Sequence, residues 1–558
     1  MQVSVNIRGT RAEIESACEP YGYHPLSLRI LAGLIADDRE TPGDIAVANQ
    51  LDITDDVIAN KHHVLEVAYN TLSQEQQKLL STIACFRAPT IYDALKSITS
   101  ASPSPTGEGA GGEVLNQNLK TLENRGLLHW DRKTNKYDLH PIVRRYAYER
   151  LTAPDRTAAH TRLRDYFDAV PKPEKIEKLE DLAPVIELYH HTVQAGQYDK
   201  AILLYYQRIA DSIYFQFGGY QTAIDLLKAL LVDGENKPPR SEKNDYKAFV
   251  LNAPANSYGL SGQPLRAAFL FELSNEFSEK HGDKEGVAAG LGNLAGEQIS
   301  IGSLHAAEAS LHQAIQIDQE SHREHEEACD RQELGRLLSY CGVWNKAEQE
   351  LLRSQKVFDE VGPGRTNYGS VNWAFRSMCL LLMARTQPKS EINNLKSAIQ
   401  FAQNALTLAE ETARTEHPNE VDFLRAHWLL GDAYRLNGQL DFAERHLSEA
   451  LTRDRAINLV MFEADILLDL ARLRYDQKNY EEAKSLAEEA LTITERCGYV
   501  LQGADVNLFL AQFALEQEKD KAKAKEYAEI ALKLATCDGP PYYYKVAYEE
   551  AERMLEKL

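Results

Sequence analysis

The stretch that decides the fold reads L-G-D-A-Y over residues 430–434 and continues with Ala443, Leu447 and Ala450. Counted from Gly431, the sites that matter fall at +3, +12, +16 and +19. The same offsets recur from four other anchor residues, and after a fifth, Ala511, the second helix is shifted by one residue, with Ala524, Ala528 and Ala531. Neighbouring anchors are 40 residues apart within each of two groups. The six anchors are Ala255, Ala295, Gly335, Gly431, Ala471 and Ala511. This regular spacing predicts an array of equal structural units.

Each unit is predicted to be a pair of antiparallel helices. Small residues at the anchor and at +12 allow the two helices to approach closely, and larger residues at +3 and +16 fill the space beside that contact. Turn-forming residues, such as those at 437–439 and 477–480, lie between the helices. Because a single pair cannot bury its apolar face, successive pairs must stack into a superhelix.

This pattern resembles the tetratricopeptide repeat, with a period of 40 residues in place of the usual length of about 34. The resemblance covers roughly residues 185–540. It implies an all-α fold, a right-handed superhelix in which the first helix of each pair lines a concave groove. We assign residues 153–558 to this solenoid and expect a capping helix at its C-terminal end.

The N-terminal part of the chain does not follow the 40-residue period. A helical hairpin is predicted over residues 10–36, within a small helical region that we place at 1–54. Alternating apolar residues on both sides of a turn at 131–135 predict a β-hairpin. Short helices together with this two-stranded wing predict a winged-helix domain over residues 55–152. Residues 101–113 have the composition of a mobile, disordered loop.

Three segments of this N-terminal part carry a further pattern: G-Y-H-P-L-S-L at residues 22–28, the helical segment 63–95, and L-H-P-I-V-R at residues 139–144. In this order they resemble the small helical domain, the winged helix and the M-H-D motif of signal-transducing STAND nucleotidases of the NB-ARC type. The resemblance implies that Pro25 packs against adenine and that His140 contacts the terminal phosphate of a nucleotide.

The sequence contains no G-x-x-x-x-G-K-[ST] motif, so no lysine and hydroxyl pair is present to hold phosphates and magnesium. We therefore expect the chain to be the C-terminal portion of such a protein, without its P-loop domain. Pro25 and His140 are cofactor-binding residues only where that domain is supplied. The chain itself is expected to hold no cofactor, although ADP or ATP is implied for a complete STAND protein.

Composition excludes several classes of function. The net charge of -21 opposes binding to nucleic-acid phosphates. No apolar run is long enough for a membrane helix, and seven scattered cysteines without a C-x-x-C pair indicate free thiols in the cytoplasm. The adjacent histidines His62 and His63, and likewise His190 and His191, cannot share a helix face, so we expect no metal site. No catalytic constellation is present, and we expect no enzyme activity.

The predicted concave wall is rich in arginine and aromatic residues, which is unexpected in an acidic chain. Residues six and three before each anchor, and one and four after it, face the groove. They include Gln332, Arg336, Arg425, Trp428, Arg435, Arg472, Tyr475 and Gln512. We hypothesise that this wall binds an acidic or carboxylate-ended peptide or ligand through charge-assisted hydrogen bonds and stacking. The alternative is that the arginines pair within the chain with acids such as Asp432 and Asp465.

The sequence therefore predicts the sensor arm of a STAND-type signalling regulator. Its solenoid would bind a protein or peptide trigger, and its winged helix would couple that event to a nucleotide-binding domain in the same chain or in another. A free-standing tetratricopeptide scaffold is one alternative. A winged-helix transcription regulator is a second, in which Arg144 and Arg145 would reach DNA phosphates against the overall charge of the chain.

Overall fold

The computed structural model divides the chain into two compact units. It describes residues 7–51, 56–99, 108–173, 175–234, 237–361, 366–386, 391–415 and 418–558. Unit 1 comprises Met1–Lys175 and Asp181–Ala201, and unit 2 comprises Ile176–Glu180 and Ile202–Leu558. The three-part division of the chain made from the sequence stays a prediction, and the first two helices that follow residue 152 belong to unit 1.

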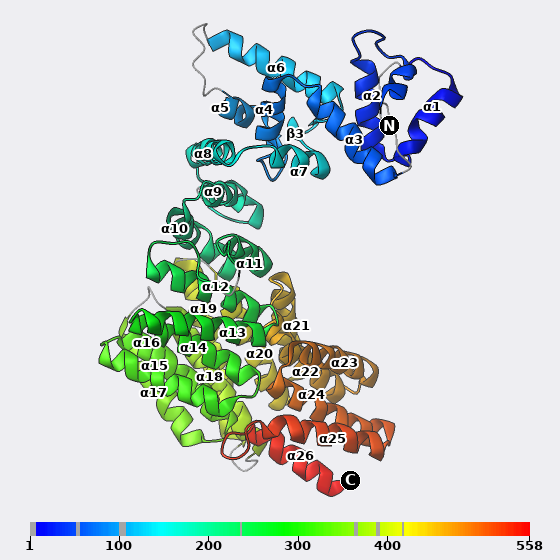
Figure 1. Ribbon diagram of the computed structural model, residues 1–558. Helices are drawn as coiled ribbons and strands as arrows, with labels where there is room; N and C mark the ends of the chain where they lie inside the picture. Colours follow the sequence, from blue (N-terminus) through cyan, green and yellow to red (C-terminus); the bar gives the residue numbers. More distant parts are fainter. Residues whose placement is uncertain are drawn as a thin grey trace. The chain divides into compact units, whose positions relative to one another are not determined.

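Unit 1 consists of helices around one apolar core and a small sheet (Figure 1). Its helices are α1 (Arg11–Cys18), η1 (Glu19–Tyr21), α2 (Pro25–Ala36), η2 (Ile45–Gln50), α3 (Val57–Asn70), α4 (Gln74–Ile83), α5 (Tyr92–Thr99), α6 (Glu108–Asn124), α7 (Pro141–Glu149), α8 (Ala153–Ala169) and α9 (Ala183–Gln194). The helical hairpin predicted over residues 10–36 corresponds to α1 and α2. A capping box starts α1, because Thr10 accepts a hydrogen bond from the Glu13 amide and Glu13 bonds back to the Thr10 amide.

The predicted β-hairpin is confirmed. Strand β2 (His129–Asp131) pairs antiparallel with β3 (Lys136–Asp138), and β1 (Thr90–Ile91) adds a third strand on the other side of β3. Trp130 lies opposite Tyr137, and their rings stack with centroids 5.8 Å apart. This cross-strand aromatic pair stabilises strands that are too short to hold together by backbone hydrogen bonds alone.

The loop predicted at residues 101–113 needs correction at its C-terminal end. Residues 101–107 lie outside the described residues, whereas 108–113 form the start of α6. The glycine-rich composition favoured a loop. However, the amphipathic stretch behind it, with Leu115, Leu119 and Leu122 buried, already forms helix. Extending a formed helix by one residue costs much less than nucleating its first turn, so the helix continues into the glycines.

Unit 2 is a stack of antiparallel helix pairs (Figure 1). Its elements are η3 (Leu179–Leu182), α10 (Tyr198–Arg208), η4 (Ser212–Gln216), α11 (Tyr220–Lys228), α12 (Asn244–Leu260), α13 (Pro264–Lys280), α14 (Lys284–Ser300), α15 (Leu304–Glu320), α16 (Glu324–Tyr340), α17 (Trp344–Val361), α18 (Thr366–Thr386), α19 (Glu391–Thr415), α20 (Glu420–Leu436), α21 (Leu440–Ala456), α22 (Val460–Asp476), α23 (Tyr480–Cys497), α24 (Val500–Phe513), η7 (Ala514–Glu518), α25 (Lys521–Thr536) and α26 (Lys545–Lys557). Elements η3 and α10 cross the boundary between the two units.

The helix starts reproduce the predicted period. Helices α12, α14 and α16 begin at residues 244, 284 and 324, and α20, α22 and α24 begin at 420, 460 and 500. The intervening pair α18 and α19 is longer. The predicted fold class is confirmed: stacked helix pairs follow a helical region with a small β-hairpin.

The anchor residues lie where the two helices of a pair come closest. A Cβ atom added at Gly335 would lie 2.6 Å from Cγ of Leu351, and one added at Gly431 would lie 2.5 Å from Cγ of Leu447. Both leucines occupy the +16 site. The alanines at the +12 site, such as Ala443, are fully buried in the same contact. A small anchor is therefore required because the leucine of the partner helix occupies the space of a side chain.

Turns of the N-terminal repeats touch helix starts and helix ends in the C-terminal repeats. At each of these turns, a glycine with positive φ leaves room for a residue far along the chain. A Cβ atom added at Gly302, for example, would lie only 2.7 Å from Cγ1 of Val500 and would overlap it. The pairs are Gly218 with Ile457, Gly262 with Val460 and Cys497, Gly302 with Val500, and Gly342 with Lys545. Helices α12 and α22, and likewise α14 and α24, are in contact. The stack of unit 2 therefore bends back upon itself.

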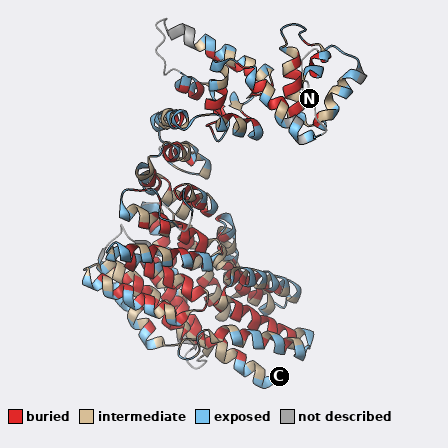
Figure 2. Cartoon of the chain, viewed as in Figure 1, coloured by how far each residue is buried: buried red, intermediate tan, exposed pale blue. Residues whose placement is uncertain are grey.

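Buried residues follow the contacts between helices throughout unit 2 (Figure 2). They include one large cluster formed by residues of α14–α20 and α24–α26. Helix α26 packs on α24, α25 and α18. None of the described helices combines the length and the apolar character that crossing a bilayer requires.

Replacing Gly431 with alanine is expected to lower the free energy of unfolding by about 1–3 kcal/mol, because the new methyl group overlaps Leu447. Gly369→Ala in α18 is the matched control, since its Cβ would lie 3.4 Å from Leu408 at the nearest. There the better helix propensity of alanine makes the change neutral or stabilising by up to about 1 kcal/mol. Urea denaturation of both variants measures the difference, and equal midpoints would contradict the close helix contact.

Candidate partner-binding site

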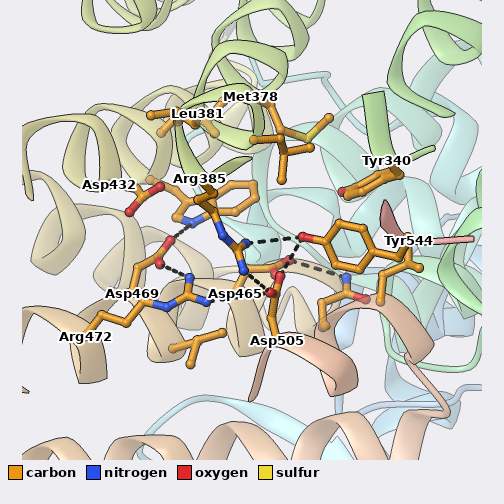
Figure 3. A pocket seen from close by; sticks show the side chains of 16 residues that line it. Tyr340, Met378, Leu381, Arg385, Asp432, Asp465, Asp469, Arg472, Asp505 and Tyr544 are labelled. Carbon is orange, nitrogen blue, oxygen red and sulfur yellow. Dashed lines mark hydrogen bonds and ion pairs between the residues drawn. The ribbon is translucent and has the colours of Figure 1, made fainter. Parts of the chain in front are cut away.

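The inner wall of unit 2, defined here as the facing surfaces of α14, α16, α18, α20, α22 and α24, contains two cavities. Gln332, Arg336 and Arg425 line the larger one, which has a volume of about 670 Å³. Trp428 and Arg472 line the smaller one, of about 60 Å³ (Figure 3). The other three residues of the predicted groove, Arg435, Tyr475 and Gln512, are not part of either lining. Their side chains pair with acids of the chain, Arg435 with Asp432 and Asp476, and Tyr475 and Gln512 with Glu516.

Two arginines with aromatic neighbours form one side of the larger cavity. Arg336 donates a hydrogen bond to Glu333 (2.8 Å), and its guanidinium lies over the ring of Phe375 at 5.4 Å. Arg425 donates to Asp422 (3.1 Å) and lies over the ring of Phe462 at 5.2 Å. Each arginine therefore has one close carboxylate and at least one aromatic ring beside it, and Arg425 also lies over Phe375 at 5.9 Å. This packing orients the remaining N–H groups of both side chains.

The pairing of Arg425 with Asp422 leaves both groups short of partners. Burial lowers the pKa of Arg425, and Asp422 and Glu333 offset that effect only in part. Burial also raises the pKa of Asp422 to about 6, despite the attraction of Arg425. In addition, Arg425 Nε, Asp422 Oδ2 and the Oε1 atom of Gln332 have no hydrogen-bond partner among the residues that the structure describes. An arrangement of this kind gains free energy when a ligand supplies the missing hydrogen bonds.

Acidic residues line another part of the same cavity. Burial, and next the neighbouring Asp318, raise the pKa of Asp330 well above its ordinary value. One carboxyl group of this pair therefore keeps its proton near neutral pH. A Cβ at Gly292 would lie 2.3 Å from Asp330 Oδ1, so the glycine of α14 is what allows the carboxyl group to fit between the helices. Protonation reduces the negative charge on the lining of this cavity.

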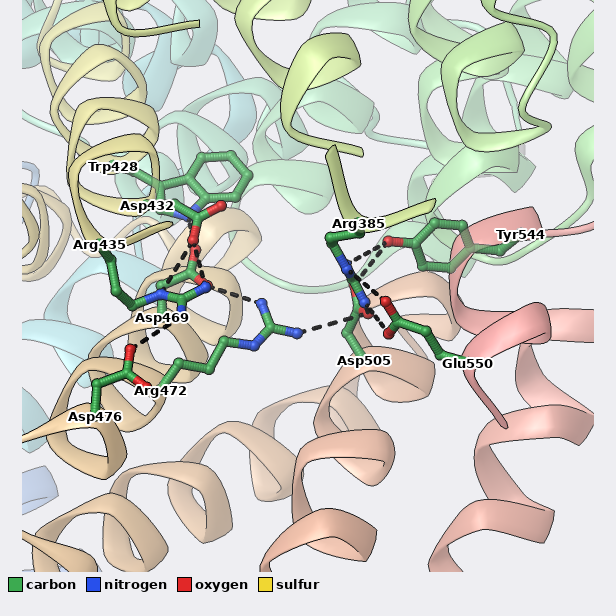
Figure 4. Close-up of polar contacts among 10 residues, drawn as sticks. All are labelled: Arg385, Trp428, Asp432, Arg435, Asp469, Arg472, Asp476, Asp505, Tyr544 and Glu550. Atoms are coloured by element: carbon green, nitrogen blue, oxygen red, sulfur yellow. Dashed lines mark hydrogen bonds and ion pairs between the residues drawn. The ribbon is translucent and has the colours of Figure 1, made fainter. Parts of the chain in front are cut away.

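The smaller cavity is surrounded by a network of charged side chains that satisfy one another (Figure 4). Arg385 of α18 donates hydrogen bonds to Asp505 (2.6 Å), Glu550 (2.7 Å) and the Tyr544 hydroxyl (3.3 Å). Burial alone would raise the pKa of Asp505, but Arg385 and Arg472 together hold it below its ordinary value. Arg385 thus joins α18, α24 and the C-terminal helix α26.

The same network continues towards α20. Arg472 donates to Asp469 (2.8 Å) and lies 3.7 Å from Asp505, while Trp428 Nε1 donates to the other oxygen of Asp469 (2.7 Å). The sequence suggested Asp465 as a partner for these arginines, but this carboxylate accepts a hydrogen bond from Gln502. Internal pairing therefore accounts for the arginines of the smaller cavity, and the larger cavity keeps unsatisfied polar atoms.

Arg385→Gln is expected to destabilise unit 2 by about 3–5 kcal/mol, because it leaves Asp505 and Glu550 without their partner at a site that is mostly buried. The control Arg353→Gln removes an arginine whose side chain is 60% exposed and which pairs with Glu350. That change should cost less than about 1 kcal/mol. Thermal and urea denaturation compare the two, and equal losses of stability would show that the network contributes nothing.

The structure places each of the two residues that the STAND resemblance singled out at the start of a helix. Pro25 is the first residue of α2, directly after His24, and His140 precedes α7 and accepts a hydrogen bond from the Ile142 amide (3.3 Å). Burial, and next the nearby His24, lower the pKa of His140. His24, which precedes α2, is therefore close enough to His140 to act on it electrostatically. Contact of either residue with a nucleotide stays a prediction.

The arginines of the transcription-regulator alternative are both paired within the chain. Arg144 donates to Asp138 of β3 (2.5 Å), and Arg145 donates to Glu149 one turn along α7 (2.9 Å). Contacts of these residues with DNA phosphates would first have to break or share these ion pairs.

Sequence reasoning missed Arg385, Phe375 and Phe462. The first two lie on the long helix α18, which carries none of the six anchor residues found from the sequence. The structure identifies Ser377 as the equivalent residue, because its hydroxyl donates to the Ala398 carbonyl of the paired helix (2.9 Å). From Ser377 the offsets +1 and +4 select Met378 and Leu381, which line the smaller cavity.

The tetratricopeptide repeat family model matches residues 422–496, which correspond to α20–α23. No curated protein matches the sequence. Among solved structures, a STAND protein with a tetratricopeptide repeat sensor from Pyrococcus horikoshii is similar, with 15% identity and a TM-score of 0.45, over 96% of this chain and 72% of that one. A Rap protein complexed with competence and sporulation factor is similar with 12% identity and a TM-score of 0.44, over 71% of this chain and 94% of that one.

The family match and the helix pairs together define unit 2 as a tetratricopeptide-type solenoid. Folds of this class bind partners, because their curvature creates extended concave surfaces.

Proposed function

We propose that unit 2 is the sensor of a STAND-type signalling regulator and that the larger cavity of its inner wall receives an acidic or carboxylate-ended segment of a protein or peptide. The observation that carries this proposal is the pair Arg336 and Arg425, buried beside aromatic rings in a cavity of about 670 Å³.

A peptide that carries a carboxylate suits this cavity for three reasons. It accepts hydrogen bonds from guanidinium N–H groups in a bidentate geometry. It replaces the weak internal partnership of Arg425 with Asp422, in which burial shifts both groups towards their neutral forms. A peptide also offers backbone N–H donors for the free Oε1 atom of Gln332. The volume falls within the range of pockets that bind small ligands, so a few peptide residues would fill it.

Unit 1 would couple this binding event to a nucleotide-binding domain. Pro25 and His140 each stand at a helix start, and His24 acts electrostatically on His140, which supports that role. Copurification of the full chain with a P-loop protein, or the presence of such a domain in the natural protein, tests the coupling. A chain that binds peptides and never associates with a P-loop domain would be a free-standing scaffold.

Peptide binding is tested with the full chain and a library of random hexapeptides that have free C-termini. Arg425→Gln and Arg336→Gln are each expected to lower the affinity for the selected peptides about 10–100-fold, because a hydrogen bond to a charged group contributes about 1.5–3 kcal/mol. The same peptides with an amidated C-terminus, or with Asp changed to Asn and Glu to Gln, should lose affinity by a similar factor. Fluorescence anisotropy measures the dissociation constants.

The matched control is Arg445→Gln, on the outer helix α21, where the arginine is exposed and lies over Phe442 at 5.5 Å. Its affinity for the peptides should equal that of the unaltered chain. Melting temperatures of all three variants establish that they are folded. Selected peptides that bind equally well with and without Arg336 and Arg425 would exclude the cavity as the site.

A further inference from the structure

Three histidines of unit 1 converge on one point. His160 lies on α8, and His190 and His191 lie on α9, which packs against it. One ring nitrogen from each imidazole can be chosen so that all three lie within 4.8 Å of one another. His160 Nδ1 and His191 Nδ1 are 2.9 Å apart. His160 and His191 are buried, and His190 is partly exposed.

The outer nitrogen of each buried ring lies near a polar group, and that of His160 is at hydrogen-bond distance from its neighbour. Nε2 of His160 lies 3.1 Å from the Tyr148 hydroxyl, and Nε2 of His191 lies 3.7 Å from Glu187 Oε2. Glu187 is itself mostly buried beside this cluster. Ligating histidines in proteins usually donate their second N–H to such a carboxylate, hydroxyl or carbonyl group, which fixes the ring and its tautomer.

The contact between the two Nδ1 atoms has a clear chemical meaning. Without a cation, one of the two atoms must carry a proton, because two facing lone pairs repel each other. When His160 moves its proton to Nε2, where the Tyr148 oxygen accepts it, both Nδ1 atoms present lone pairs to the same space. A cation can take these two lone pairs, and His190 supplies a third.

We propose that His160, His190 and His191 form a binding site for one divalent transition-metal ion of the zinc type. Three neutral imidazole ligands suit zinc and the neighbouring late transition metals rather than magnesium or calcium, which prefer oxygen ligands. Glu187 supplies the negative charge that balances the ion, and it is a positioning residue. The nearby cations Arg87 and Arg156 oppose the ion, so the affinity is expected to be moderate.

The sequence predicted no metal at this place because His190 and His191 are adjacent on one helix. The structure shows that both rings reach the same neighbour: the centroids of His190 and His191 are 5.1 Å apart, and each lies within 5.8 Å of the His160 ring. The third ligand comes from another helix, about thirty residues earlier in the chain.

The test uses the full chain after treatment with a chelator and dialysis. Zn²⁺ binding is measured by competition with a chromophoric chelator, and Co²⁺ is added separately for its visible absorption. One equivalent per chain is expected. His160→Asn and His190→Asn should each weaken Zn²⁺ binding at least about 10-fold. Losses of this size already follow from changing residues that only hydrogen-bond to a metal ligand. Zn²⁺ should also raise the melting temperature of the unaltered chain, because it binds only the folded state.

A second histidine pair in unit 2 provides the control. His427 Nδ1 and His446 Nδ1 are 2.8 Å apart, but among the described residues this pair belongs to no group of three ligands. His446→Asn should leave zinc binding unchanged. The absence of one stoichiometric equivalent of bound Zn²⁺, or an equal loss of binding in His446→Asn, would overturn the proposal. Should His160→Asn fail to fold, His190→Asn decides, because its position is partly exposed.

Discussion

The contact between turns of the N-terminal repeats and helix starts of the C-terminal repeats is the constraint on which unit 2 depends. Gly262 and Gly302 adopt positive φ values of 86° and 79°, and their lack of a side chain brings the turns onto Val460 and Val500. The 40-residue spacing of these glycines equals the spacing of the valines. One period in the sequence therefore produces two effects: helices that pair closely within each repeat, and a stack whose far ends meet.

This closure explains why the inner wall differs from an open groove. Facing helices bring arginines and carboxylates out of water, where each charge requires a partner. At the end nearest α26, Arg385 and Asp505 find several partners and form a network around a cavity too small for more than a few water molecules. At the other end, Arg425 and Gln332 keep unsatisfied atoms beside about 670 Å³ of space. The polar side chains at one end of the wall are therefore paired with one another, whereas those at the other end have atoms left to bind a ligand.

The sequence predicts features that depend on local spacing and fails where distant segments meet. The helix pairs follow from anchors such as Gly431, because its contact with Leu447 recurs at a fixed offset. Five of the eight groove residues line the two cavities for the same reason. Arg385 was missed because it lies eight residues after Ser377 near the end of the long helix α18, outside the four offsets that select wall residues. His160 was missed because no periodic signal links α8 to α9, and the packing of these two helices alone places the ring beside His191.

Closure of the superhelix is tested most directly by a single substitution, Gly262→Cys. A Cβ at this position would lie 2.8 Å from the sulfur of Cys497, which is close to the separation found across a disulfide. Gly282→Cys is the control, because its turn has a similar positive φ and no other atom lies within 4 Å. After mild oxidation, peptide mapping by mass spectrometry is predicted to find residue 262 joined to Cys497 in most molecules and residue 282 free. Equal reactivity of both introduced thiols, with no intramolecular disulfide, would contradict the closed superhelix.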